Sequence, residues 1–253
     1  MSNGKGVKRQ RKKELRRERI EQQMRQRRAR RRRMSLLATL LIGAAITAFL
    51  IQFSGRERPP TERAACTHSK PAGGNTETPD QPPEMTIDPA KTYTAELETS
   101  CGSVEIELAA QTSPNTVNSF VYLANRGFYN GLPFHRVVRD FAIQGGDPRG
   151  DGSGGPNYKT VDVPPADFKY VKGTVAMAKA GPEPPGTAGS QFFIVPGAKG
   201  EVLPAEYAVL GKVVGGQRAV DALNAIETRP SPQGEQSMPA EPIYISKITV
   251  KET

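Results

Sequence analysis

The sequence contains no tryptophan and only two histidines among its 253 residues. His68 and His135 leave almost no material for a histidine-based metal site or for a serine–histidine triad. Ser190 also lies outside the Gly-x-Ser-x-Gly pattern that marks a hydrolase nucleophile. We therefore expect neither a metal nor a cofactor, and interpret His135 as a hydrogen-bonded structural residue.

Basic residues far outnumber acidic ones at the N-terminus. Residues 1–33 contain 16 lysines or arginines and three glutamates, a net charge of +13, so the other 220 residues carry −4 of the total of +9. The basic character belongs to a tail, and nucleic-acid binding by the rest of the chain is not expected. We interpret 1–33 as a cytoplasmic tail that contacts anionic lipid headgroups. Binding of the tail to RNA is the alternative.

An uncharged run follows this tail, since residues 34–53 read MSLLATLLIGAAITAFLIQF. A helix needs about 20 apolar residues to cross the hydrocarbon core, so the run predicts a transmembrane helix at 34–53. A cleaved signal peptide is the alternative, although the basic segment is long and no good cleavage site follows. The excess of Lys and Arg before the run predicts a single-pass protein of the cell membrane, with the N-terminus cytoplasmic and the remainder outside.

The only two cysteines, Cys66 and Cys101, both follow the predicted span, on the side where disulfides persist. A bridge between them would stabilise the fold by about 3–4 kcal/mol in the chain-entropy model. Their pairing cannot be read from the sequence. A disulfide and two free thiols both remain open.

Residues 54–90 are rich in proline and glycine and poor in apolar residues, which predicts a disordered linker. From residue 91 the pattern changes to alternating apolar residues, which predict a hairpin of strands at 93–97 and 104–108. Ser113-Pro114 predicts the start of a helix.

Further strands are expected at 133–138, 141–144, 173–178, 191–195, 207–214 and 243–250, and a second helix at 217–226. About eight strands and two helices, joined by loops rich in glycine and proline, predict a mostly β domain at 91–253. The expected fold is a closed eight-stranded antiparallel β-barrel with two helices.

Two short motifs place polar residues among phenylalanines. The first runs from Phe134-His135-Arg136 to Asp147, and the second is Gly189-Ser190-Gln191-Phe192-Phe193-Ile194. Apolar walls supply affinity and a few polar groups fix orientation in binding sites. The motifs therefore predict a site that binds an apolar group and holds a carbonyl oxygen by hydrogen bonds.

These motifs, together with Gln144-Gly145-Gly146-Asp147-Pro148, Gly173–Ala178 and Leu210–Val213, resemble in their order those of a cyclophilin-type peptidyl-prolyl cis-trans isomerase. The resemblance covers residues 91–253 and none of the tail, span or linker, and membrane-anchored actinobacterial members are similar in layout. It implies an enzyme that accelerates rotation of X-Pro peptide bonds in proline-containing polypeptides. With the predicted span, this suggests assistance to the folding of exported proteins, and we expect a monomeric catalytic domain.

The resemblance also implies roles for individual residues. Arg136, Gln144 and Gln191 are the expected catalytic residues, with the permanently charged guanidinium of Arg136 as the donor to the rotating bond. A surface arginine in a salt bridge is the alternative for Arg136. The residues expected to bind the substrate are Phe141, Ala142, Ala178, Lys179, Phe193, Leu203 and Tyr207.

Some positions depart from the common pattern of the family. Ala142 stands where methionine is frequent, Lys179 where asparagine is, and Tyr207 where histidine is. A binding or scaffolding module with little turnover is the alternative function. The intact set of Arg136 and Gln191 with the two phenylalanines favours the enzyme.

Overall fold

The computed structural model describes residues 66–77 and 80–253, which belong to one compact unit. The tail predicted at 1–33 and the transmembrane helix predicted at 34–53 lie outside the described residues. Among the helices that are described, none is both long and apolar enough to span a bilayer.

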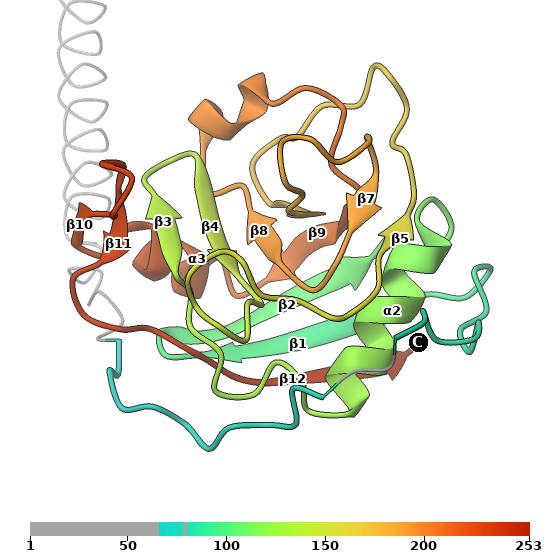
Figure 1. The fold of residues 1–253 in the computed structure, drawn as a ribbon, viewed down its shortest axis with the longest axis horizontal. Coiled ribbons are helices and arrows are strands. Elements are labelled where there is room, and N and C mark those ends of the chain that lie inside the picture. Colours follow the sequence, from blue (N-terminus) through green and yellow to red (C-terminus); the bar gives the residue numbers. More distant parts are fainter. Residues whose placement is uncertain (1–65, 78–79) are drawn as a thin grey trace, which may run out of the picture. The chain divides into compact units, whose positions relative to one another are not determined.

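The domain is mostly β, as predicted, and its main feature is one large antiparallel sheet (Figure 1). In the described part of the chain this sheet has eight strands in the spatial order β12-β1-β2-β9-β6-β8-β4-β3. Their bounds are β1 (Tyr93–Thr99), β2 (Gly102–Leu108), β3 (Arg136–Val138), β4 (Ala142–Gly145), β6 (Thr174–Met177), β8 (Phe192–Ile194), β9 (Val209–Gly215) and β12 (Ile245–Glu252).

The prediction of a closed barrel was wrong, because the two edge strands β12 and β3 do not pair. The chain ahead of β3 meets the other edge only over a short stretch. Pro133 bridges Tyr244, and the Phe134 N–H donates to the Ile243 carbonyl at 2.9 Å. Ile245, the first residue of β12, accepts the Gly131 N–H and donates to the Leu132 carbonyl, each at 2.8 Å. Proline has no N–H with which to continue a ladder, and β11 (Gln236–Pro239) packs beside β3. The sheet therefore curls without closing.

The first hairpin forms where the alternating pattern placed it. In the pairing of β1 with β2, Leu97 lies opposite Val104 and Ala95 lies opposite Ile106. All four side chains are buried in the main core. The turn uses Gly102 at a φ of +112°, a conformation that glycine adopts without a steric penalty.

Two helices pack on the sheet within residues 80–253. The first, α2 (Pro114–Asn125), lies against β12, and the second, α3 (Gln217–Asn224), lies against β2, β3 and β4. Ser113 precedes α2 as predicted but makes no side-chain capping bond. Instead the Asp162 carboxylate accepts the Thr116 N–H at 2.6 Å, a favourable place for a negative charge.

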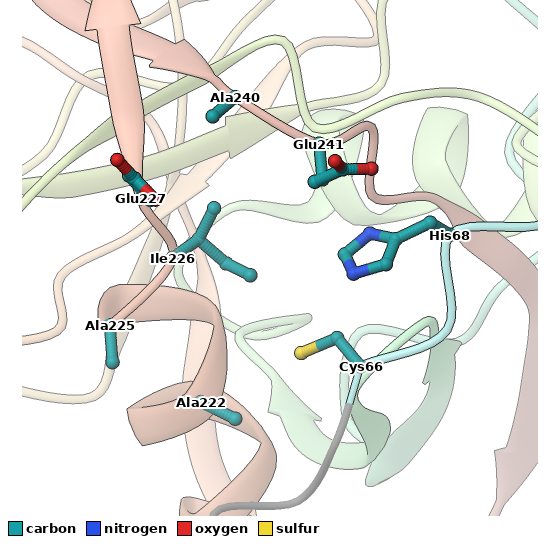
Figure 2. Close-up of a pocket in the computed structure, with 8 residues that line it drawn as sticks. All are labelled: Cys66, His68, Ala222, Ala225, Ile226, Glu227, Ala240 and Glu241. Carbon is teal, nitrogen blue, oxygen red and sulfur yellow. The ribbon is translucent and has the colours of Figure 1, made fainter.

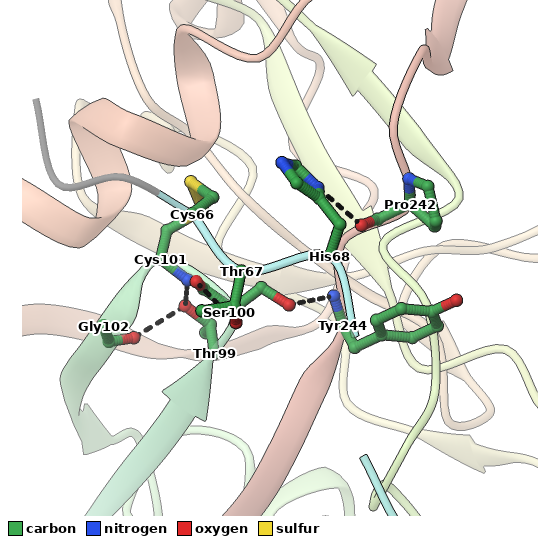
Figure 3. Close-up of a disulfide and its surroundings, with 9 residues drawn as sticks. All are labelled: Cys66, Thr67, His68, Thr99, Ser100, Cys101, Gly102, Pro242 and Tyr244. Carbon is green, nitrogen blue, oxygen red and sulfur yellow. Dashed lines mark hydrogen bonds between the residues drawn. A yellow bond between two sulfur atoms is a disulfide. The ribbon is translucent and has the colours of Figure 1, made fainter. Parts of the chain in front are cut away.

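The described part of the predicted linker has a defined path along the domain (Figure 1), and Figure 3 shows its first residues beside the turn of the first hairpin. Cys66 and Cys101 form a disulfide that joins this segment to the turn of the first hairpin. Beside it, the Thr67 N–H donates to the Ser100 carbonyl at 2.8 Å. The segment is therefore tied to the hairpin both covalently and through its backbone.

Later parts of the same segment are also held. The Gly74 N–H donates to the Asn130 carbonyl at 3.0 Å, and the Asn118 side chain accepts the Thr86 N–H at 2.9 Å. Ile87 is buried in the main core. The expectation of disorder is not met at residues 66–77 and 80–90, because these polar groups and one apolar side chain have partners on the domain.

Several short elements were not predicted. The strands β5 (Thr160–Val161) and β7 (Thr187–Ala188) pair with each other, and β10 (Thr228–Pro230) pairs with β11. A 3₁₀ helix, η1 (Ala198–Val202), precedes β9. Segments of two to five residues carry too little periodic signal to be recognised in a sequence.

Candidate active site

Strand register brings the predicted site residues into one row. Arg136 on β3 lies opposite Gln144 on β4, and Gln144 lies opposite Phe193 on β8. Phe193 in turn lies opposite Ala176 on β6. Residues directly opposite each other in antiparallel strands share a face. A cation, an amide and an aromatic ring are therefore neighbours on one surface.

Arg136 is held on three sides. Its Nε and Nη2 donate to the two carboxylate oxygens of Glu235, each at 2.7 Å. Its Nη1 donates to Gln144 Oε1 at 3.4 Å, and its guanidinium carbon lies 5.7 Å from the centre of the Phe141 ring. Two parallel bonds to one carboxylate fix the plane of a guanidinium as well as its position. The side chain is still 30% exposed, so a bound molecule can reach it.

The two glutamines extend this network. Gln144 Nε2 donates to Gln191 Oε1 at 2.9 Å, and Gln191 Nε2 donates to the carbonyls of Gly152 and Gly154 at 2.9 and 2.8 Å. Carbonyl oxygens only accept, so these two glycines place the amino group of Gln191 toward the loop and leave its oxygen for Gln144. One chain of hydrogen bonds connects Arg136 with the glycine-rich loop.

A buried carboxylate organises that loop. Asp147 is completely buried, and its oxygens accept the backbone N–H groups of Arg149, Asp151 and Gly152 at 2.8, 3.1 and 2.6 Å. Each buried oxygen is thereby satisfied, as buried charge requires. The loop carbonyls that hold Gln191 owe their positions to this aspartate.

His135 lies next to Arg136 in the chain and points into the interior. Neither of its ring nitrogens has a hydrogen-bond partner among the described residues, so its interpretation as a hydrogen-bonded residue was wrong. Burial lowers the pKa of His135 by more than the nearby Asp147 carboxylate raises it. The imidazole is therefore mainly uncharged at pH 7.

A second hydrophobic cluster lies at the row. Phe193 and Ala142 are buried in it, and Phe141, Leu203 and Ala178 pack against it while partly exposed. The exposed parts of these side chains form an apolar surface beside Phe193. All of the apolar residues predicted to bind the substrate are thus together.

Tyr207 belongs to the same cluster and is fixed in place. Its ring meets the Phe193 ring edge-on, with centroids 5.5 Å apart. Its backbone carbonyl accepts the Tyr170 hydroxyl at 2.7 Å. Burial raises the pKa of Tyr170 to about 12, so this hydroxyl keeps its proton and remains a donor.

The side chain of Lys179 is bound by groups of the protein itself. Its side chain is only 5% exposed, its Nζ lies 3.2 Å from the Glu206 carboxylate, and it lies 5.8 Å from the centre of the Tyr207 ring. The Nζ also donates to the Glu183 carbonyl at 3.1 Å. The charge of Lys179 is therefore taken up within the protein, and a substrate would meet mainly its backbone.

A cavity of about 300 Å³ adjoins the glutamines. Lys159 and Glu183 form an ion pair of 3.0 Å at its wall. Its lining residues come from the glycine-rich loop and from the chain after β6: Gln144, Gly152, Ser153, Gly154, Gly155, Lys159, Ala178, Lys179, Ala180, Glu183, Gly189, Ser190 and Gln191. The cavity offers room for side chains that flank an apolar group held against Phe193.

A second cavity, of about 270 Å³, shares no residue with this site (Figure 2). It lies beside the disulfide, between α3 and the start of the described chain. Cys66, His68, Glu227 and Glu241 line it together with four apolar residues. None of its residues was predicted to act in the chemistry.

Glu235 is the site residue that sequence reasoning missed. It is 99 positions from Arg136 and stands in a loop rich in proline and glycine, where no periodicity marks it. Arg136 holds the pKa of the Glu235 carboxyl below its usual value through their hydrogen bonds. Only the folded structure brings the two together.

The fold and the site define a class of protein: a curled antiparallel sheet that carries an arginine, held by a carboxylate, next to an apolar surface. Comparison with known proteins gives the family. The sequence model described as "Cyclophilin type peptidyl-prolyl cis-trans isomerase/CLD" matches residues 94–250, more than half of the chain. The chain belongs to the cyclophilin-type peptidyl-prolyl cis-trans isomerase family.

Similar proteins agree with this assignment. The chain is 38% identical over 184 residues to "Probable peptidyl-prolyl cis-trans isomerase A" of Mycobacterium bovis, covering 66% of this chain and 96% of that protein. It is 38% identical over 169 residues to "Peptidyl-prolyl cis-trans isomerase-like 1" of Mus musculus, covering 65% of this chain and 95% of that protein.

A solved structure supports the fold directly. The crystal structure of a cyclophilin-type isomerase from Cryptosporidium parvum matches with a TM-score of 0.56 at 29% identity, covering 64% of this chain and 99% of that one. A second crystal structure of that protein was determined in the presence of the dipeptide Ala-Pro. The enzyme class predicted from the sequence is confirmed.

Proposed function

We propose that Arg136, Gln144 and Gln191 catalyse the isomerisation and that the apolar surface at Phe193 holds the proline ring. Rotation about a peptide bond meets a barrier of about 18–20 kcal/mol, set by resonance between the nitrogen and the carbonyl. For X-Pro bonds both isomers are populated, and their slow exchange can limit folding. The enzyme must bind the twisted bond better than either planar form.

The row of Arg136, Gln144 and Phe193 carries this proposal. In the twisted state the proline nitrogen regains its lone pair, and a fixed cationic donor stabilises it. Arg136 supplies the donor, and Phe193 supplies an apolar contact two strands away. Phe141, Ala142, Leu203 and Tyr207 complete the walls, and the backbone at Ala178 and Lys179 faces the residue before proline.

The alternative of a scaffold with little turnover has one observation in its favour. The ion pair of Arg136 with Glu235 is the salt bridge that would occupy a purely structural arginine. This ion pair does not separate Arg136 from Gln144 and Phe193. The enzymatic function is therefore the better supported of the two.

The decisive experiment compares Arg136→Ala with the wild type in a protease-coupled isomerisation assay on the full-length protein. We expect kcat/KM to fall about 100-fold, as for the loss of one preorganised donor. Arg139→Ala is the control, because Arg139 has a charge near β3 and donates only to the Ala225 carbonyl at 3.4 Å. Equal inactivity of the wild type and Arg136→Ala would favour the scaffold.

We further propose that the enzyme acts outside the cell membrane on exported, proline-containing polypeptides. This rests on the uncharged run at 34–53, on the basic tail at 1–33 and on the presence of a disulfide in the domain. The measurement is digestion of intact spheroplasts with an added protease. Loss of the domain signal while a cytoplasmic marker survives is expected, and protection of both would contradict the location.

A further inference from the structure

Glu235 stands at a fixed place beside the proposed active site. It immediately precedes β11, the strand that packs beside β3 and its Arg136. A tight turn holds it: the Ser231 N–H donates to the Glu235 carbonyl at 2.7 Å, and the Gly234 N–H donates to the Ser231 carbonyl at 2.8 Å. Gly234 takes a φ of +85°, which favours glycine. The backbone of Glu235 is therefore set by the hairpin and not by Arg136.

The hydrogen bonds of Arg136 divide its donors into two sets. A guanidinium has five N–H donors in a fixed plane. The Nε–H and one Nη2–H go to Glu235, and one Nη1–H goes to Gln144. One N–H of Nη1 and one N–H of Nη2 remain, and no described residue accepts them. Glu235 thus fixes the guanidinium through Nε and Nη2 and leaves two donors for a ligand.

We propose that Glu235 is a positioning residue for the isomerisation, which orients the two unused donors of Arg136 toward the substrate; this rests on the proposed function of Arg136. Gln144 alone would hold the guanidinium through a single bond of 3.4 Å, which leaves its plane free to turn. The bidentate pair removes that freedom. Catalysis by a preorganised donor depends on such restriction.

The charge of Glu235 is present wherever the enzyme would work. Its hydrogen bonds with Arg136 lower the pKa of the carboxyl, so the group is ionised at neutral pH. Its side chain is 43% exposed, so solvent weakens the pair. The contribution of Glu235 should therefore be moderate, and should come from orientation more than from attraction.

The test is a double-mutant cycle on kcat/KM in the full-length protein. We expect Glu235→Gln to lower kcat/KM about two- to fivefold and Glu235→Ala about fivefold. In an Arg136→Ala background neither change should have a further effect. Glu227→Gln is the matched control, since it removes the same charge next to β10 of the same hairpin and should leave activity unchanged.

A second readout follows the arginine itself. In ¹H–¹⁵N spectra we expect the Arg136 Nε–H to exchange slowly with water in the wild type and in Glu227→Gln, and quickly in Glu235→Gln. A wild type no more active than Arg136→Ala would defeat the proposed function, whereas the spectra would still report whether Glu235 immobilises the guanidinium. An active wild type matched or exceeded by Glu235→Gln would overturn the positioning role.

Discussion

The two halves of the sheet are built differently. On one side β1 and β2 have seven residues each and β12 has eight, and they pair along almost their whole length. On the other side β3 and β8 have three residues and β4 has four. The candidate active site lies on the short-strand half.

In the short-strand half, side-chain hydrogen bonds supplement the few backbone hydrogen bonds that the short strands make. The bonds from Glu235 through Arg136, Gln144 and Gln191 to the glycine-rich loop hold together segments that the strands alone join only briefly. In the long-strand half, backbone bonds and a buried core do this work. We therefore expect substitutions in the long-strand half to change mainly stability, and substitutions in the short-strand half to change mainly activity.

The largest expected effect on stability comes from Leu97→Ala in the long-strand half. Leu97 is completely buried, and truncation of such a leucine costs about 2–5 kcal/mol of unfolding free energy. The kcat/KM of the folded protein should stay unchanged. Urea unfolding and the isomerisation assay measure the two quantities.

Leu203→Ala is the matched control in the other half. Leu203 is only partly buried and packs against the hydrophobic cluster that contains Phe193. It should lose activity and little stability, the reverse of Leu97→Ala. If both variants lose stability and activity in parallel, the separation of the halves is refuted.

The next effect concerns the disulfide. Its partners are 35 residues apart, so replacing Cys66 and Cys101 by serine should lower the unfolding free energy by about 3–4 kcal/mol in the chain-entropy model. Activity at low temperature should persist, because Cys101 belongs to the main hydrophobic core and Cys66 packs against it, whereas Phe193 of the row belongs to the second hydrophobic cluster. Dithiothreitol should shift the urea midpoint of the wild type and not that of the double variant; equal midpoints in all samples would contradict this.

A smaller effect on stability is expected from Gln191→Ala. Its amide makes three hydrogen bonds in the network, so we expect about a tenfold loss of kcat/KM, which is ~1.4 kcal/mol of activation free energy. The unfolding free energy should fall by about 1 kcal/mol. Gln217→Ala on α3 is the control, since its amide bonds only Asp221. A loss of stability without loss of activity would show that Gln191 merely holds the loop.

The smallest effect is a pH dependence from His135. Burial lowers the pKa of His135 in the folded protein, so below about pH 6.5 the unfolded chain binds a proton that the folded one resists. Stability is therefore complete above that pH and declines as the pH falls toward the pKa of the folded state. The urea midpoint between pH 8 and 5 measures this decline.

His135→Gln should flatten the decline, whereas His68→Gln should retain it, because His68 lies at the surface near Pro242. Identical pH profiles for all three proteins would show that His135 does not titrate within this range.

The long-strand half could be predicted from the sequence because its signals are local. Alternation of apolar residues at 93–97 and at 104–108 predicted the hairpin, and Ser113-Pro114 predicted the start of α2. The residues at the site came from a different source, the resemblance of two motifs to a known family. Register then explains why Arg136, Gln144 and Phe193 are neighbours.

The features that escaped prediction depend on distant partners. The barrel stays open because β3 and β12 do not pair, although the chain ahead of them bridges once, from Pro133 to Tyr244. Glu235 acquires its role only because the hairpin of β10 and β11 folds back beside β3. Ile87 joins the core from a segment whose composition resembles a linker. A single sequence shows local preference, and these positions are decided by tertiary contacts.

The bond between Cys66 and Cys101 also determines how a mechanical load would enter the domain. A pull on the chain ahead of Cys66 passes through the sulfurs to the turn between β1 and β2. The residues between the two cysteines, including Ile87 and strand β1, are shielded from that force. A force applied from the N-terminal side of the domain therefore does not separate its first strand, β1, from the sheet.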